Sequence, residues 1–240
     1  MTNTRPDRPV GPPVPNWTPP PWPVRTALEG RYARIEPLDP DVHAAPLFHT
    51  FAGEDWLWDY MPVGPFADEG SYRDWMQAAV AQNDPWFFAI RNLETNQVAG
   101  VASYLRITPA AGTIEVGNIN FSPALQRTRA ATEAMFLLMG WAFDAGYRRY
   151  EWKCNAANAG SRRAAQRFGF SYEGIFRQAA VIKGRNRDTA WFAAIDTEWP
   201  ALKEAFEAWL SPSNFDANGN QMERLGDLTG LVRAASDPTL

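Results

Sequence analysis

The sequence predicts a single-domain α/β fold of the α+β kind, in which a mixed central sheet of about seven strands is flanked by helices. Two patterns lead to this expectation. In the first half, alternating apolar segments return on themselves through short turns, as antiparallel strands do. The middle of the chain then alternates strand and helix twice, as parallel strands with crossover helices do. With 240 residues and 45% apolar content, the chain can bury one full core.

The first half supplies the antiparallel part of the predicted sheet. Its strands have period-two alternation, and its second helix opens on Asp68 and Glu69, whose negative charge suits a helix N-terminus. Turns at 92–96 and 109–112 separate the later strands. The elements expected here are a strand at 31–36, helices at 41–51 and 68–82, and strands at 86–90, 98–107 and 113–121.

The second half supplies the alternating part. Asn158 precedes a helical run as a good N-cap, and Gly169 follows it as a left-handed terminator. The elements expected here are a helix at 132–143, a strand at 149–154, a helix at 162–168, a hairpin of 171–181 and 187–195, and a last helix at 198–210.

The ends of the chain differ in composition from the domain at residues 25–210. Residues 1–24 hold nine prolines and two tryptophans, which favours polyproline II and predicts an N-terminal arm. Whether this arm is a disordered leader or docks its tryptophans on the body stays open. Residues 211–240 are polar and rich in turn-forming residues, so they are expected to be a C-terminal tail.

The composition also excludes several classes of protein. A net charge of −4 gives no sign of a nucleic-acid partner, and no apolar run reaches membrane-spanning length. The first 30 residues lack the pattern of a signal peptide, and one cysteine cannot form an intrachain disulfide. Two histidines and one cysteine are too few for a conventional zinc site, so no metal is expected. A cytoplasmic protein fits these observations.

A basic loop lies between the strand at 113–121 and the helix that follows. Residues 126–131 read Gln-Arg-Thr-Arg-Ala-Ala. A strand that passes through such a loop into a helix presents free backbone N–H groups and the positive end of a helix dipole. This arrangement suits a phosphate or pyrophosphate group, and the two arginines add charge that can pair with it.

Together these features resemble the GNAT acetyltransferase superfamily, and within it the branch of RimJ/RimL-type acetyltransferases. The family pattern is Gln or Arg-x-x-Gly-x-Gly or Ala, then helix, strand, Asn-x-x-Ser, helix and Gly-Phe. Arg129 stands where the pattern has its central glycine. The resemblance covers about residues 28–200, and the matching residues are Gln126, Ala131, Asn158, Ser161, Gly169 and Phe170.

This resemblance implies acetyl-CoA as a cosubstrate. It implies that the backbone of Asn118, Ile119, Asn120 and Phe121 bonds the pantetheine arm much as an added strand would. It also implies that Asn158 bonds the pantetheine side, and that the pyrophosphate is lined by Gln126, Arg127, Arg129, Ala130 and Ala131. Arg129 in place of glycine either adds a direct phosphate contact or distorts the loop.

The same resemblance indicates where acid and base could lie. Glu115, on the strand that would flank the acetyl group, is the candidate base that accepts a proton from the amine. A strand carboxylate can also simply face water. Ser161 is the candidate donor for the departing thiolate, although a serine in a first helical turn often bonds only backbone. The tyrosine common in the second motif helix is replaced by Ala165, and Ala180 stands where many relatives of the RimL kind have an acidic residue.

The function implied is N-acetylation of a primary amine by direct attack in a ternary complex. The acceptor, a protein N-terminus or a small-molecule amine, stays open. An aromatic region that includes Trp56, Trp58, Tyr60, Trp75 and Trp86 would border its cleft. The alternative is a non-catalytic acyl-CoA-binding relative that acts as a sensor or interaction module, and a third hypothesis is a scaffold whose arm recruits a partner. Neither a nucleic-acid nor a membrane partner is expected, and a homodimer is plausible.

Overall fold

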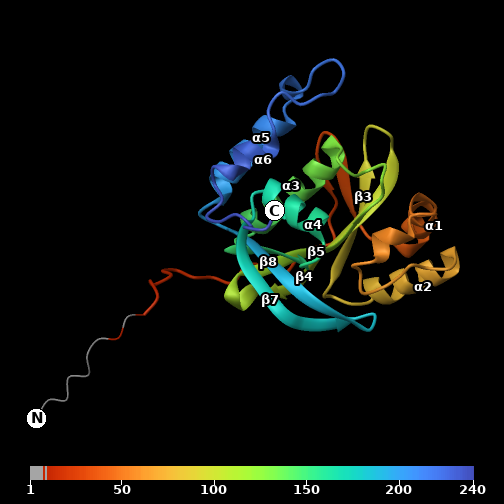
Figure 1. Cartoon of the computed structure of the whole chain (residues 1–240), viewed down its shortest axis with the longest axis horizontal. Helices are drawn as coiled ribbons and strands as arrows, with labels where there is room; N and C mark the ends of the chain where they lie inside the picture. The colour runs from red at the N-terminus through yellow and green to blue at the C-terminus, as the bar shows by residue number, and fades with distance from the viewer. Residues whose placement is uncertain (1–7, 9) are drawn as a thin grey trace, which may run out of the picture.

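An eight-stranded mixed sheet forms the centre of the protein, whose computed structural model describes residue 8 and residues 10–240 (Figure 1). The strand order is β1-β2-β3-β4-β5-β6-β8-β7; the β5–β6 pair is parallel and the other pairs are antiparallel. The predicted mixed sheet is therefore confirmed, with one strand more than the approximate count because β1 pairs with β2. The strands are β1 (Leu28–Glu29), β2 (Ala33–Pro37), β3 (Trp86–Asn92), β4 (Gln97–Thr108), β5 (Thr113–Phe121), β6 (Arg149–Asn155), β7 (Ser171–Ile182) and β8 (Arg185–Ile195).

Four of the α-helices, α1 to α4, begin where a short polar side chain caps them. Asp39 accepts a hydrogen bond from the Asp41 N–H, and Asp68 forms a capping box with Ser71. No helix of the described residues is long and apolar enough to cross a membrane. The helices are α1 (Pro40–Thr50), α2 (Glu69–Val80), α3 (Arg129–Asp144), α4 (Ala159–Arg167), α5 (Trp199–Leu210) and α6 (Leu225–Gly230), with short 3₁₀ turns η1 (Asp55–Trp58), η2 (Pro109–Ala111) and η3 (Pro212–Asn214).

The helices cover the sheet in two separate groups. Along β3, Phe88 and Ile90 join the core cluster that contains α3, α4 and α5, whereas Ala89 joins the cluster of α1 and α2. Because successive strand residues point to opposite faces, the two groups lie on opposite sides of the sheet. Figure 1 shows α1 and α2 together at the right, apart from the helices around α5. On the face that bears α1 and α2, α1 contacts β4, α2 contacts β3, and η1 contacts β5.

Helix α3 begins at Arg129, three residues earlier than the sequence predicted. Thr128 is the reason, because its Oγ1 accepts a hydrogen bond from the N–H of Ala131 at 3.1 Å. The predicted start at Thr132 was wrong because the polar residues of the loop concealed the first helical turn. Part of the predicted basic loop is therefore the first turn of α3.

One carboxylate joins α3 to the start of the sheet. Glu133 is buried, and its side chain accepts hydrogen bonds from the backbone N–H groups of Arg31, Tyr32 and Ala33 at 2.9, 2.5 and 2.7 Å. Gly30 makes this approach possible, because a Cβ there would lie 2.3 Å from the carboxyl carbon of Glu133. The orientation of α3 is thus fixed against the β1–β2 turn.

The Pro/Trp-rich arm contacts the body near the end of its length. Tyr147 donates a hydrogen bond from its hydroxyl to the carbonyl of Pro21 at 3.0 Å. The Arg148 guanidinium lies 5.6 Å from the Trp17 ring centroid, and Arg25 lies 4.7 Å from that of Trp86. Of the two alternatives for the arm, the structure therefore shows docking on the body for these residues. Met1–Asp7 and Pro9 lie outside the described residues.

Residues 211–240, expected to be a polar tail, pack on α4 and β7. Leu225 of α6 is fully buried, and Asp237 forms an ion pair with Arg162 at 2.5 Å. The backbone N–H of Tyr172, at the start of β7, donates to the carbonyl of Ala235 at 3.1 Å. This segment completes the core on the α4 side, although its polar composition did not predict such packing.

Candidate functional site

The parallel strands β5 and β6 separate partway along their length. They pair from Thr113 with Arg149 to Val116 with Trp152, and the pairing then stops although β5 continues to Phe121. Beyond Val116, β5 pairs only with β4. The backbone of Gly117–Phe121 therefore presents an unpaired edge toward β6, and an extended ligand can bind such an edge as an added strand does.

A bulge in β5 directs Asn118 toward the side of α2. Ser103 of β4 pairs with Gly117 and Val101 with Asn120, so β5 has one residue more than β4 in this interval. Asn118 takes a left-handed backbone conformation, with φ of 48°, and donates from its amide to the Ser103 hydroxyl at 2.9 Å. Asn118 and Asn120 both line a cavity of about 220 Å³ beneath α2.

The end of β5 is connected to the basic loop. Ile119 and Phe121 are partly buried against the main core, which fixes this half of the strand. The Gln126 amide donates to the carbonyl of Phe121 at 2.8 Å. Gln126 therefore holds the loop against the strand by its side chain.

The loop offers backbone N–H groups at the start of α3. Arg127 is exposed and left-handed, with φ of 62°, and α3 begins two residues later. Among the described residues, the backbone N–H groups of Arg127, Arg129 and Ala130 make no hydrogen bond. Ala130 and Ala131 are buried, so no side chain there blocks the helix end. Free N–H groups and the helix dipole together suit an anion.

The side chain of Arg129 points away from this helix end. Its guanidinium pairs with Glu94, in the β3–β4 turn, and lies 4.7 Å from the Tyr32 ring centroid and 5.0 Å from that of Phe215. Its backbone is helical, so a glycine is not needed for the local conformation. Of the two alternatives for Arg129, a distorted loop is not observed, and the guanidinium is engaged by other parts of the protein.

Glu115 lies in a buried charged cluster that it forms with side chains of β4 and β6. It is 2% exposed, so the alternative of a carboxylate that faces water is wrong. Arg106 contacts its Oε1 at 2.7 Å, and Lys153 of β6 contacts its Oε2 at 2.9 Å and Glu151 at 2.6 Å. Burial raises the pKa of the Glu115 carboxyl, and the charges of Arg106 and Lys153 oppose this rise.

The next position on this face of β5 has no side chain of its own. Gly117 follows Glu115 on the same strand, and a Cβ there would lie 3.5 Å from Oε1 of Glu115 and 2.8 Å from Leu105. The side chain of Leu105 packs on Gly117, and Oε1 of Glu115 lies beside them in contact with Arg106.

Ser161 and Asn158 lie together at the start of α4, beside β6. Asn158 is the N-cap, as predicted, and its Oδ1 accepts from the Ser161 N–H at 3.0 Å. Trp152 donates from Nε1 to the Ser161 hydroxyl at 3.0 Å, so the hydroxyl oxygen is an acceptor in this contact. Burial raises the pKa of the neighbouring Cys154 thiol, and a hydrogen bond from Ser161 opposes the rise. Ala165 is fully buried in the core and offers no group to this region.

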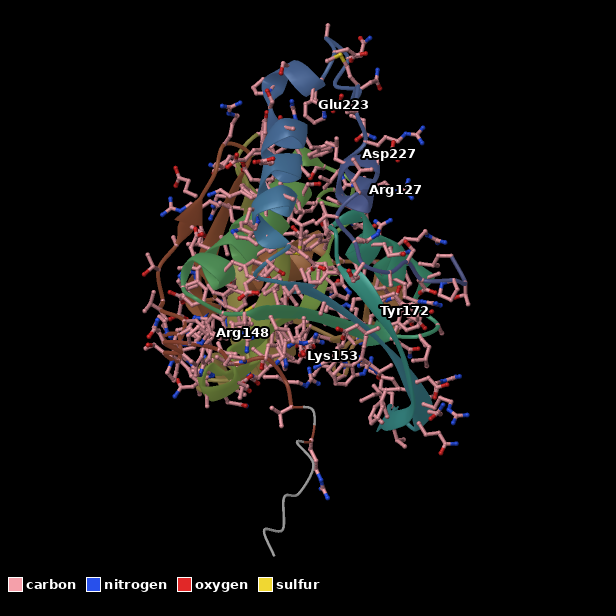
Figure 2. All side chains as sticks on the ribbon, turned by 90° about the vertical axis from the view of Figure 1, so that its left-hand side faces the viewer. Arg127, Arg148, Lys153, Tyr172, Glu223 and Asp227 are labelled. Atoms are coloured by element: carbon pink, nitrogen blue, oxygen red, sulfur yellow. The ribbon has the colours of Figure 1, made fainter. Side chains whose placement is uncertain are left out.

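The structure brings the sequence-predicted residues together at two places along the open edge of β5. Figure 2 shows Arg127 well above Lys153, so the loop and the charged cluster at Glu115 are far apart. An elongated ligand is needed to reach both. Among the described residues, no group of three or more His, Cys, Asp or Glu side chains is placed to share a metal ion.

Sequence reasoning missed the partners of Glu115. Lys153 and Glu151 alternate on β6, and Glu151 is the register partner of Glu115 in the parallel pair. The alternation Arg149-Glu151-Lys153 was a visible signal of a charged face, but the register that brings it to Glu115 is not legible in the sequence. Trp75 was expected only as one aromatic residue bordering an acceptor cleft, and Phe87 only as part of a strand, so their contact in the wall of one cavity was not predicted.

Comparisons with known proteins agree on one family. Residues 33–171 match the family model of the acetyltransferase (GNAT) domain. The structure is similar to that of a GCN5-related N-acetyltransferase from Brucella melitensis, with a TM-score of 0.88 and 48% identity over 90% of this chain and 100% of that chain. A search of curated proteins found no match.

More distant structures share the fold. A RimL-type ribosomal alpha-N-protein acetyltransferase in complex with coenzyme A has a TM-score of 0.60 and 21% identity, over 71% of this chain and 99% of that chain. An acetyltransferase from Salmonella typhimurium that modifies the N-terminal serine of a ribosomal subunit protein has a TM-score of 0.60 and 22% identity, over 69% of this chain and 96% of that chain.

Proposed function

The chain belongs to the GNAT acetyltransferase family, and we propose that it transfers an acetyl group from acetyl-CoA to a primary amine by direct attack in a ternary complex. The observation that carries this proposal is the separation of β5 from β6 beside the start of α3. An open strand edge and free helix N–H groups at one end of it fit a long thioester with a pyrophosphate. The family as a whole uses acetyl-CoA.

The residues present fit this cosubstrate in their chemistry. The unpaired edge of Asn118–Phe121 would bond the amide groups of the pantetheine arm. The N–H groups of Arg127, Arg129 and Ala130 would bond the pyrophosphate, with the exposed Arg127 guanidinium as the added charge. Asn158 uses its Oδ1 as a cap, which leaves its amide N–H groups for the pantetheine side.

Glu115 is assigned the role of base. An amine near its ordinary pKa is mostly ammonium at neutral pH, so a proton must leave before attack. The Glu115 carboxyl is buried beside Gly117, and the charges of Arg106 and Lys153 oppose the rise in its pKa that burial causes. The proton leaves the amine nitrogen and is held at Oε1, directly or through one water.

Ser161 is assigned the role of acid. Acetyl-CoA supplies the thioester, whose cleavage releases a thiolate that needs a proton. The Ser161 hydroxyl accepts from Trp152, and in this role its own proton turns from the Cys154 thiol to the departing thiolate. Because a serine hydroxyl is a weak acid, its contribution is a positioned hydrogen bond with proton exchange to water.

The binding step is tested by calorimetry with acetyl-CoA, desulfo-CoA and ATP at moderate salt. We expect micromolar binding of both CoA compounds and much weaker binding of ATP. Arg127→Gln should weaken acetyl-CoA about 10-fold, because one charge-assisted hydrogen bond is lost. Arg129→Gln should weaken it less, because that guanidinium pairs with Glu94. Absence of acetyl-CoA binding would contradict the proposal, and binding without release of thiol in the presence of any amine would indicate a non-catalytic module.

The pH dependence of turnover tests the base. Burial raises the pKa of Glu115 and Lys153 opposes this, so Lys153→Met should raise the pKa further. The acidic limb of kcat/KM, where the base becomes protonated, should then move to higher pH. Lys153→Arg should restore the limb, and Lys203→Met on α5 serves as a control outside the cluster. A lower rate with an unmoved limb would show that Lys153 acts on the fold and not on the base.

A further inference from the structure

A cavity with aromatic walls lies beneath α2 and extends to β5. It measures about 220 Å³, and its walls include Trp58, Trp75 and Phe87. The rings of Trp75 and Phe87 meet edge to face, with centroids 5.5 Å apart and planes at 80°. Trp75 also stacks on Tyr72, at 5.5 Å and 8°. These contacts hold the walls in place, so the cavity is a formed space.

The cavity reaches the strand on which acetyl transfer is proposed to occur. Asn118 and Asn120 of β5 line it, and the backbone of the same residues forms the unpaired edge toward β6. Because one strand separates the two, a group in the cavity would lie only a few bonds from an amine placed at that edge. The cavity is therefore positioned for the part of the acceptor next to its reactive nitrogen.

The lining residues define the chemistry of that group. None of them is Asp, Glu, Lys or Arg; they are Trp58, Met61, Pro62, Val63, Tyr72, Trp75, Ala78, Ala79, Gln82, Pro85, Phe87, Val101, Asn118 and Asn120. A second ammonium group, as in a polyamine, would be buried there without a counter-charge, which is costly. A small polar side chain, such as that of serine, would leave the aromatic walls uncovered.

Two polar side-chain groups of the lining residues are left without a hydrogen-bond partner. The amide nitrogen of Asn120 and the hydroxyl of Tyr72 are buried and have no hydrogen-bond partner among the described residues. Buried polar groups are nearly always paired, so each marks a place where a ligand atom or a water can supply the missing bond. An aromatic group with a weakly polar edge, such as an indole or a phenol, provides both contact area and such an atom.

We infer that the acceptor is a primary amine that carries an aromatic group close to its nitrogen, and that this group binds in the cavity that Trp75 and Phe87 line. The inference rests on the proposed acetyl transfer and adds the substrate class to it. The amine is either a small arylalkylamine or the N-terminus of a peptide whose first residue is aromatic. Both present the same chemistry to the cavity.

The test compares kcat/KM for amines of different classes with acetyl-CoA saturating. The panel is tryptamine, 2-phenylethylamine, 2-aminoethanol and spermidine, with peptides that begin with Phe or Ser to distinguish the two sources. We expect the aromatic amines or the Phe peptide to exceed the others by roughly 10- to 100-fold, as burial of one ring predicts. A preference for spermidine, 2-aminoethanol or the Ser peptide would overturn the inference.

Variants connect the preference to the cavity. Trp75→Ala should lower kcat/KM for the preferred aromatic acceptor by roughly 10-fold or more and leave that for 2-aminoethanol unchanged. Ala78→Trp, on an exposed position of α2, should fill the space and have the same selective effect. Trp56→Ala is the matched control, because Trp56 is 54% exposed and does not line the cavity. Equal losses for all acceptors in Trp75→Ala and Ala78→Trp would contradict a role in specificity.

The two proposals fail in different ways. If no amine of the panel releases thiol although acetyl-CoA binds, the proposed transfer fails and the question of acceptor class no longer arises. If turnover occurs but shows no aromatic preference, the transfer stands and the inference about the cavity is wrong. Calorimetry of Trp75→Ala with acetyl-CoA should match the wild type, which separates acceptor binding from cosubstrate binding.

Discussion

Glu115→Gln is expected to lower kcat for amine acetylation by roughly 100-fold or more at neutral pH, with acetyl-CoA affinity unchanged. The amide keeps the shape of the side chain but cannot accept the proton of the ammonium. The loss should shrink as the pH rises, because more of the amine is then already deprotonated in solution. Rates measured from pH 6 to 10, together with calorimetry of acetyl-CoA binding, check both statements.

Glu151→Gln is the matched control for this variant. Glu151 is also buried, is bonded by Lys153 at 2.6 Å, and lies beside Glu115 in the parallel register. The variant removes one charge from the same cluster without removing the proposed base, so it should lose far less activity. Equal losses in the two variants would mean that the cluster acts through its net charge or its folding. Full activity in Glu115→Gln would exclude Glu115 as the base.

Glu133→Ala is expected to destabilise the fold by about 3 kcal/mol, because buried donors that lose their partner cost roughly 1 to 3 kcal/mol each. The carboxylate accepts from three backbone N–H groups, of Arg31, Tyr32 and Ala33, and alanine leaves all of them without a partner. Entry of water into the space should recover part of the loss. Urea unfolding measures the change, and the midpoint temperature should fall by about 6 to 12 °C.

Two further variants sharpen the result for Glu133. Glu204→Ala on α5 is exposed and should change the free energy of unfolding by less than about 0.5 kcal/mol. Glu133→Gln keeps one acceptor oxygen but turns an NH₂ group toward backbone donors, so it should also destabilise. A loss near that of Glu204→Ala in Glu133→Ala would show that the β1–β2 turn does not depend on this carboxylate.

The order of the elements was readable from the sequence because each element carries a local signal. Period-two alternation marks the strands, and Asn158 and Asp68 cap helices where the sequence places them. Three local features were misread. The start of α3 was placed too late because Thr128 was not recognised as its cap, and α4 begins at Ala159, directly after its cap, and not at Arg162. The hairpin predicted at 171–181 and 187–195 has a tighter turn, because β7 extends to Ile182 and β8 begins at Arg185.

The candidate site was only partly readable, because its geometry depends on contacts distant in sequence. The basic loop and the open half of β5 follow from strand and helix order together with the family resemblance. The contacts of Arg129 do not, since Glu94, Tyr32 and Phe215 come from separate parts of the chain. The burial of Glu115 depends likewise on the register of β5 against β6. The packing of residues 211–240 on the domain could not be predicted from their polar composition, because few of their side chains need to be apolar to cover α4.

Residues 211–240, which pack on α4, also cover part of an edge of the sheet. An edge strand with free N–H and C=O groups invites pairing with another chain, which leads to aggregation. β7 is one edge, and at its start the Tyr172 N–H is bonded by Ala235 and the Ser171 hydroxyl by the Ala234 N–H. Farther along, the register between Phe176 and Ala180 is irregular, and the opposite edge, β1, is only two residues long. Neither edge offers a long regular template, so the sheet should resist fibrous self-association at high concentration.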